Sequence, residues 1–361
     1  MTIKQIFMVV CVFIFPFAIL SANNSELVPL PSSGFIMNKE SLDLNRPARS
    51  RNKLYTGPII DTHVHFLKGL QATSVQNIHK EMKSAGVRKL IVMPTPNEGK
   101  YEDKSQNAYY RREWVEQFDE NAGRLCGSTY LTRWMYDAFR YGYSKSSLEK
   151  RLEKLRLDLD SQGCLGIGEI GPYHFEKKPG MSLIKFPLNF KPMLSLVKLA
   201  EQKNVPLDMH IEPISPDGKS YEDEIFASIA LYYEKYPKLR LILSHTGMTN
   251  AKNARALLQK YPLLMMNVKI VVPGRKLAWN NLGPIVNKEA KLFKDWAQLF
   301  EDMPDRFMIG TDARFGTLNY NMGKYKKVIK QIRSMLGSLE PDGAKKIAFL
   351  NAQEYFSKNN D

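Results

Sequence analysis

Eight short apolar runs, separated by amphipathic stretches, occupy most of the chain after residue 54. Each run is almost continuously apolar and is followed by loop residues, which is typical of strands buried on both faces of a parallel sheet. The runs are residues 59–66, 89–95, 124–131, 164–171, 206–211, 239–246, 263–270 and 307–313.

The stretches between these runs have helical periodicity. In residues 147–161, leucines recur at three- and four-residue spacing, and a glycine follows the end. The predicted helices are residues 75–85, 107–121, 147–161, 189–203, 222–236, 250–260, 288–302 and 323–336, with a terminal helix at 341–357. Eight strand–helix alternations predict an α/β protein with a (β/α)8 TIM barrel. An open doubly wound sheet is the alternative, but no glycine-rich phosphate loop follows an early strand.

The first residues have the pattern of a secretory signal peptide. Lys4 precedes a long apolar run that ends in small residues, so residues 1–22 are predicted to be removed on export to a periplasm or the medium. An uncleaved membrane anchor is the alternative, although the run is short for a span and Pro16 interrupts it. Residues 23–57 are predicted to form an N-terminal arm, and residues 58–361 the barrel domain. No stable membrane insertion is expected after cleavage.

The chain is basic, with 52 Lys and Arg against 37 Asp and Glu, a formal net charge of +15. Such a surplus attracts nucleic acid, anionic lipid or acidic substrates without choosing among them. The basic residues are scattered, and no basic run with interleaved aromatic residues suggests single-strand binding. Nucleic acid is therefore not the expected partner.

Two cysteines follow the signal segment, Cys126 and Cys164, in neighbouring predicted strands. A disulfide between them is conceivable, and two buried free thiols are an equal alternative because adjacent strands often miss the required Cα separation. The fold does not depend on a disulfide framework, since a chain of this length can bury a large core.

Metal-ligand residue types lie at the ends of five predicted strands. In residues 59–66, alternation along a strand is expected to put Asp61, His63 and His65 on one face. Catalytic groups of a (β/α)8 barrel lie at the carboxyl ends of its strands. Imidazole and carboxylate are ligands of zinc, manganese and iron. The predicted ligands of one or two divalent ions, zinc being the first choice, are His63, His65, Glu169, His210, His245 and Asp312. For each residue alone, a buried histidine bonded to a backbone carbonyl, or a helix cap at Asp312, is the competing interpretation.

Taken together, this set resembles the amidohydrolase superfamily of metal-dependent hydrolases, over residues 57–357. GIGEIG, MHIEP and IGTDARF are similar to motifs of TatD-type nucleases. LILSHTG and KIAFLNAQEYF resemble the sixth-strand motif and the closing helix of the amidohydrolase-related group.

The resemblance implies hydrolysis by water that a divalent ion activates. His63, His65 and Asp312 would hold a first ion, His210 and His245 would hold or flank a second, and Glu169 would bridge. Asp312 and His245 are the implied catalytic residues. Asp312 would accept the proton of the attacking water, and in mononuclear members the histidine at the position of His245 polarises the substrate instead. For Asp61, an indirect supporting role and a structural one are left open.

The chain departs from the TatD-type pattern at two places. After Glu169 it continues Ile-Gly-Pro-Tyr-His, and after His210 it continues Ile-Glu-Pro without an arginine. Nuclease activity is therefore an alternative rather than the expected function, and a decarboxylase (a lyase) using the same ligands is another. A sugar- or anion-binding barrel with a vestigial site is a third.

Loops beyond the strands are expected to select a small-molecule substrate. Its ester, lactone, amide or phosphoester bond would be cleaved. Predicted substrate contacts are Tyr173, His174, Lys269 and Arg314, with Tyr130, Arg133 and Trp134 after the third strand. Lys269 and Arg314 suit an anionic group, the alternative being solvated charges or surface ion pairs.

Overall fold

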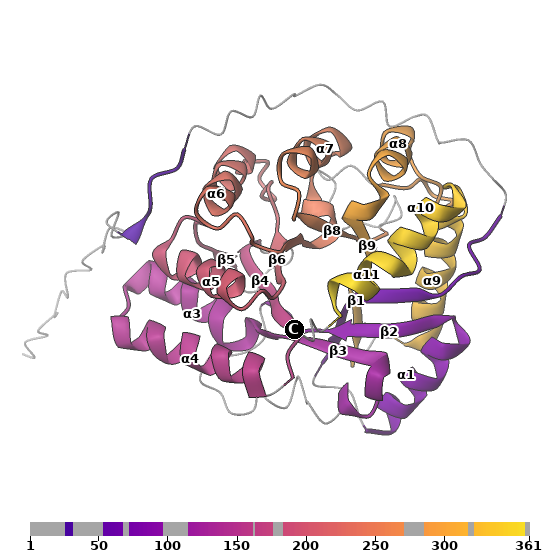
Figure 1. Ribbon diagram of the computed structural model, residues 1–361, viewed down its shortest axis with the longest axis horizontal. Helices are drawn as coiled ribbons and strands as arrows, with labels where there is room; N and C mark the ends of the chain where they lie inside the picture. Colours follow the sequence, from indigo (N-terminus) through magenta and orange to yellow (C-terminus); the bar gives the residue numbers. More distant parts are fainter. Residues whose placement is uncertain are drawn as a thin grey trace, which may run out of the picture.

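The computed structural model describes most of the barrel and two short parts of the N-terminal arm (Figure 1). The described residues are 26–31, 53–67, 72–96, 115–161, 163–175, 183–270, 285–316 and 321–357. The predicted signal peptide, residues 1–22, and most of the predicted helix 107–121 lie outside them.

Eight parallel strands form a closed barrel. In spatial order they are β1 (Ile59–Phe66), β2 (Val87–Val92), β3 (Ala122–Gly127), β4 (Gly166–His174), β6 (Leu207–Ile211), β7 (Leu241–Leu243), β8 (Met265–Val268) and β9 (Phe307–Ile309). Asp61 of β1 pairs with Ile309 of β9 and closes the sheet. Closure confirms the (β/α)8 prediction and rules out the open sheet.

Two short strands extend the barrel wall near its mouth. β5 (Ile184–Lys185) pairs antiparallel with the end of β4, and β10 (Ala313–Phe315) pairs parallel with the end of β1. The predicted eighth strand, 307–313, is thus split into β9 and the start of β10 by three residues without strand structure.

Helices surround the strands (Figure 1). They are α1 (Ala72–Ser84), α3 (Ser128–Tyr141), α4 (Lys145–Ser161), α5 (Lys191–Gln202), α6 (Glu222–Lys235), α7 (Ala251–Lys260), α8 (Lys294–Asp302) and α9 (Met322–Leu336). Side chains of Asn250 and Asn321 cap α7 and α9 by accepting backbone N–H groups. The predicted terminal helix comprises α10 (Pro341–Lys345), the π-helical turn η6 (Lys346–Leu350) and α11 (Asn351–Tyr355).

The third predicted strand, 124–131, is wrong at its end. The strand stops at Gly127, and α3 starts at Ser128. Leu131, Trp134, Met135 and Ala138 are buried along one face of α3 at helical spacing, and this period overrides the strand interpretation. Tyr130, Arg133 and Trp134, expected in a substrate loop, are therefore residues of a helix.

The barrel interior is apolar at its amino end. Ile60, Ile91, Leu125 and Met308 pack there, and Ala352 and Phe356 of the terminal segment join the same cluster. A larger apolar layer lies between the strands and the outer helices. The buried interior at this end is therefore apolar, whereas the buried histidines lie toward the carboxyl end.

The described pieces of the predicted arm contact the barrel wall. Leu27 forms a bridge with Phe190, and Glu26 accepts a hydrogen bond from Tyr143. The backbone N–H of Tyr55 donates to the carbonyl of Arg333. Among the described residues, no helix is long and apolar enough to cross a membrane.

Cys126 of β3 and Cys164, which precedes β4, form a disulfide with their Cα atoms 6.0 Å apart. Of the two alternatives drawn from the sequence, the structure contains the bridge. It joins positions 38 residues apart and so spans the whole of α3 and α4.

The disulfide should stabilise the folded protein, because it removes loop-closure entropy from the unfolded chain. For a loop of this length we expect the Cys126→Ala/Cys164→Ala variant to lose about 4 kcal/mol in free energy of unfolding. Denaturant unfolding measures this, with reduced wild-type protein as the control that keeps both side chains. Two free thiols in protein purified without reductant, or equal stability with and without reductant, would contradict the bridge.

Candidate metal centre

The six predicted ligands meet at the carboxyl end of the barrel. They are His63 and His65 of β1, Glu169 of β4, His210 of β6, His245 of the turn η4 (Ser244–Met248), and Asp312 between β9 and β10. Five of them are buried, and the Asp312 side chain is 15% exposed. Strands far apart in sequence thus contribute to one site.

Glu169 lies between the two histidines of β1 and the histidine of β6. Its Oε2 atom is 3.4 Å from His63 Nε2 and 3.6 Å from His65 Nε2. Its Oε1 atom is 2.7 Å from His210 Nδ1. One carboxylate with its two oxygens turned to different imidazoles has the arrangement of a bridging ligand.

The donor atoms form three overlapping sets, and within each set they lie within 4.8 Å of one another. The sets are His63–His65–Glu169, His63–His245–Asp312 and Glu169–His210–His245. His65 Nε2 is also 3.2 Å from His63 Nε2 and 3.0 Å from Asp312 Oδ1. Nitrogen and oxygen donors this close fit one or two ions of the zinc class.

The rings of His63 and His65 are oriented by their other nitrogen. His65 Nδ1 is 2.8 Å from the carbonyl oxygen of Met93, which can only accept, so the proton is on Nδ1 and Nε2 faces the centre. His63 Nδ1 lies 3.3 Å from both Ser244 Oγ and Asn267 Nδ2. Both Nε2 atoms are thereby aimed at Glu169, as is usual for metal-binding histidines.

The buried carboxylate of Asp208, which was not predicted from the sequence, supports His63 through Asn267 and Ser244. Asp208 Oδ2 accepts from Asn267 Nδ2 at 3.2 Å, and Ser244 donates to its other oxygen. Asn267 Oδ1 in turn accepts the backbone N–H of His245 at 2.8 Å. A signal was present, since Asp208 is two residues before His210 on its strand and Asn267 interrupts an apolar run.

Two of the ligands have an unusual backbone. His245 and Asp312 have φ values of 57° and 54°, a left-handed conformation that costs free energy in residues other than glycine. Close packing near them also requires a glycine at position 310, where a Cβ atom would lie 2.9 Å from His63 Cβ. The backbone is shaped here to aim side chains, at some cost in stability.

Opposite charges shift the pKa values of the cluster. Burial lowers the pKa of His63, but Glu169, Asp208 and Asp312 more than offset this and raise it to about 9. Burial raises the pKa of Glu169, and the charges of His63 and His210 outweigh it, so this pKa lies well below its usual range. Protons on imidazole therefore balance the buried carboxylates, and a cation can replace them.

His245 is electrostatically different from the other imidazoles. Burial, followed by the charges of Lys269 and His63, holds its pKa well below the usual value. It is therefore neutral at neutral pH, the state in which an imidazole binds a metal or accepts a proton.

Asp61 does not share a face with the two histidines, contrary to the expectation. An irregularity in the β1–β2 register lies between Asp61 and Val64 and turns the Asp61 side chain away. Its carboxylate accepts from Thr311 N at 2.9 Å, Thr311 Oγ1 at 2.6 Å and Tyr325 OH at 3.0 Å. This is a structural role at the barrel closure.

The predicted substrate residues divide into two groups. Tyr173 is wrong as a mouth residue, because its ring is fully buried in the apolar layer and its hydroxyl donates to Glu224 of α6. His174, the next residue on β4, faces the site, with its ring centroid 4.9 Å from that of His210. Strand alternation explains why only one of the two can face the barrel axis.

Lys269 and Arg314 flank Asp312. Lys269 forms an ion pair with Asp312, and Arg314 Nε is 3.9 Å from Asp312 Oδ1. These charges hold the pKa of Asp312 well below its usual range, against the effect of burial. Arg314 is 45% exposed, so its guanidinium is accessible from the mouth.

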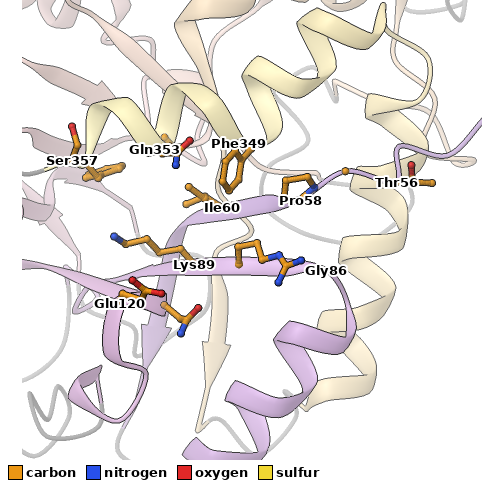
Figure 2. Close-up of a pocket in the computed structure, with 14 residues that line it drawn as sticks. Thr56, Pro58, Ile60, Gly86, Lys89, Glu120, Phe349, Gln353 and Ser357 are labelled. Atoms are coloured by element: carbon orange, nitrogen blue, oxygen red, sulfur yellow. The ribbon is translucent and has the colours of Figure 1, made fainter.

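A cavity of about 710 Å³ opens at the opposite, amino end of the barrel (Figure 2). Pro58 lines it from just before β1, Ile60 from β1, Lys89 from β2, and Phe349 and Gln353 from the terminal helical segment. Catalytic groups of this fold lie at the other end of the strands, and that end is where the histidines meet.

No protein-family model matches the chain, and none of the curated proteins matches it. Solved structures with a similar fold include a TatD homologue from Escherichia coli K12, at 17% identity and a TM-score of 0.51, covering 82% of this chain and 97% of that one. An uncharacterised TIM-barrel protein from Bordetella bronchiseptica matches at 14% identity and a TM-score of 0.50, covering 82% and 98%. A beta-aspartyl dipeptidase from Fervidobacterium islandicum, in complex with a beta-Asp-Leu dipeptide, matches at 14% identity and a TM-score of 0.50, covering 84% and 78%. At this identity the likeness establishes the fold.

Zn²⁺ binding to metal-free protein should release protons, because the ion replaces protons on the imidazoles. Apparent affinity should rise with pH until about 9, the pKa of His63, by about tenfold per pH unit for each proton displaced. This pKa is raised above that of the unfolded chain. Its contribution to apoprotein stability is therefore complete below about pH 6.5 and is lost as pH rises through about 9.

Calorimetric titrations of the apoprotein with Zn²⁺ in buffers of different protonation enthalpy count the released protons. Chelator competition between pH 6.5 and 9 gives the slope. Affinity that is independent of pH over this range, with no proton release, would show that these imidazoles are not the ligands.

Proposed function

We propose that the protein is a metal-dependent hydrolase acting on an ester, lactone, amide or phosphoester bond of a small molecule. The observation that carries this proposal is the convergence of four imidazoles and two carboxylates, from five strand ends and turns, at the carboxyl end of a (β/α)8 barrel. The fold alone does not require such a cluster, because the interior residues at the amino end of the same barrel are apolar.

The donor set supports a division into two ion positions. His63, His65 and Asp312 would hold one ion, His210 and His245 would hold or flank the other, and Glu169 would contribute an oxygen to each. A bound divalent ion supplies Lewis acidity, which lowers the pKa of water and polarises a carbonyl or phosphoryl oxygen. Zinc is proposed first, with manganese or iron as alternatives for a site of nitrogen and oxygen donors.

Asp312 is proposed to accept the proton of the attacking water and to pass it to the leaving group. Its low pKa keeps the carboxylate ionised at neutral pH, the form that can accept a proton. Lys269 and Arg314 balance this charge and are proposed to bind an anionic group of the substrate beside it. His245, neutral and close to both Glu169 and Asp312, is proposed as a ligand or as the group that polarises the substrate.

The same site leaves two alternative reactions to be separated by experiment. A nuclease would release nucleotides from DNA, and a decarboxylase would release carbon dioxide without taking up water. In ¹⁸O-labelled water, any hydrolysis, including that by a nuclease, should place one labelled oxygen in the product, whereas the organic product of decarboxylation should carry none. Release of nucleotides from DNA separates the nuclease from the proposed hydrolase. We also propose that the mature protein is exported after cleavage of residues 1–22.

Asp312→Asn should lower turnover by about 10²- to 10⁴-fold, the usual contribution of a positioned proton acceptor, while metal content stays largely intact. Metal analysis of the purified protein comes first, followed by a panel of lactones, phosphoesters and amides with the best metal restored. The matched control is Asp305→Asn at an exposed aspartate that pairs with Lys346, and it should leave turnover unchanged. Near-normal turnover of metal-loaded Asp312→Asn would remove this role from Asp312.

A further inference from the structure

Two further metal-ligand side chains form a cluster with His210 at the rim of the centre. This rim cluster consists of His174, His210 and Glu212, whose donor atoms lie within 4.8 Å of one another. The three residues are 5%, 4% and 6% exposed. Two imidazoles and one glutamate are also a ligand set used by zinc sites that leave one position for water.

Two separate segments are needed to build the rim cluster. His174 follows Glu169 on β4, and Glu212 follows His210 at the end of β6. The parallel pairing of Tyr173 with Ile211 places the two strand ends side by side. These are the two positions at which the sequence departs from the TatD-type motifs, so both departures meet at one point in space.

Glu212 is held in a fixed orientation. Its backbone N–H donates to the carbonyl of Tyr173 at 2.9 Å, and its Oε2 accepts from the backbone N–H of Phe175 at 3.3 Å. The other oxygen, Oε1, is 2.9 Å from His210 Nε2. The carboxylate therefore points toward the imidazole of His210 and away from solvent.

His210 has a carboxylate at each ring nitrogen, Glu169 at Nδ1 and Glu212 at Nε2. With a cation in place of the proton on Nε2, Nδ1 would still donate to Glu169, which lies 2.7 Å away, and the Nε2 lone pair would bind the cation. A histidine that binds a metal with one nitrogen and donates to a carboxylate with the other is the usual arrangement at metal sites.

We propose that the rim cluster binds a divalent cation of the zinc class, separate from the ions of the centre. His174, His210 Nε2 and Glu212 Oε1 supply its ligands, and the hydrogen bond from His210 to Glu169 connects it to the centre. When His210 binds the rim ion, the centre still has His63, His65, His245, Asp312 and Glu169 as ligands. The inference goes beyond the proposed hydrolase, because the rim ion is defined by binding and not by turnover.

Two variants test the rim site through metal content. His174→Phe keeps an aromatic ring against His210 but removes the donor nitrogen, and Glu212→Gln keeps the shape but removes the charge. After Zn²⁺ loading and dialysis against a weak chelator, each variant should retain one ion fewer per chain than wild type. The matched control His79→Phe, in α1 beside Phe118, should retain the wild-type number.

Equal zinc content in wild type, His174→Phe and Glu212→Gln would overturn the rim site. Circular dichroism and melting temperature check that each variant is folded, and if one unfolds the other still decides. Anomalous diffraction from protein crystallised with Co²⁺ separates this inference from the proposed function. A peak among His174, His210 and Glu212 supports the rim site, while peaks at the centre alone overturn it and leave the hydrolase proposal standing.

Discussion

The pairing of the first strand with the last is the interaction on which the site depends. Asp61 pairs with Ile309, and its carboxylate accepts both the N–H and the hydroxyl of Thr311. One residue further, the backbone N–H of Asp312 donates to the carbonyl of His63 at 2.9 Å. Because the barrel closes at this point, a carboxylate from the end of the chain lies 3.0 Å from a histidine near its beginning. In an open sheet these groups would be at opposite edges.

Burial makes the polar cluster costly, and its cost argues for a function. Charged groups removed from water are stabilising only when each is paired and hydrogen-bonded, and apolar replacements of similar volume are often as stable. At the amino end of the barrel, the apolar side chains of Ile60, Ile91 and Met308 pack in the interior, which carries no such desolvation cost. The carboxyl end instead collects imidazoles, carboxylates and two left-handed backbone residues, the kind of local violation expected at a working site.

Much of the site could be predicted because a parallel barrel collects all its strand ends at one mouth. The positions of His63, Glu169, His210 and Asp312 at the ends of apolar runs are therefore enough to place them together.

Irregularities of the backbone explain the residues whose orientation could not be predicted from the sequence. A register shift in β1 turns the side chain of Asp61 away from His63. The third strand ends earlier than predicted, because residues from Ser128 onward form a helix. Alternation along β4 would put Tyr173 on the same face as Glu169, but register irregularities on either side of Ile170 place His174 on the site face instead and bury Tyr173. Asp208 and Asn267 are visible as polar residues within apolar runs, but the support that they give His63 depends on contacts between strands.

These strand-end residues are proposed to bind a divalent ion through nitrogen and oxygen. X-ray absorption spectroscopy of the zinc-loaded protein tests this proposal most directly. We predict a first shell of nitrogen and oxygen at about 2.0–2.2 Å, with the outer-shell scattering of imidazole and no sulfur. Substitution of His63 and His65 by asparagine should lower the amount of bound zinc and leave only the signal of an ion in the rim cluster. A spectrum of hydrated zinc alone, or one that the double substitution leaves unchanged, would contradict the account.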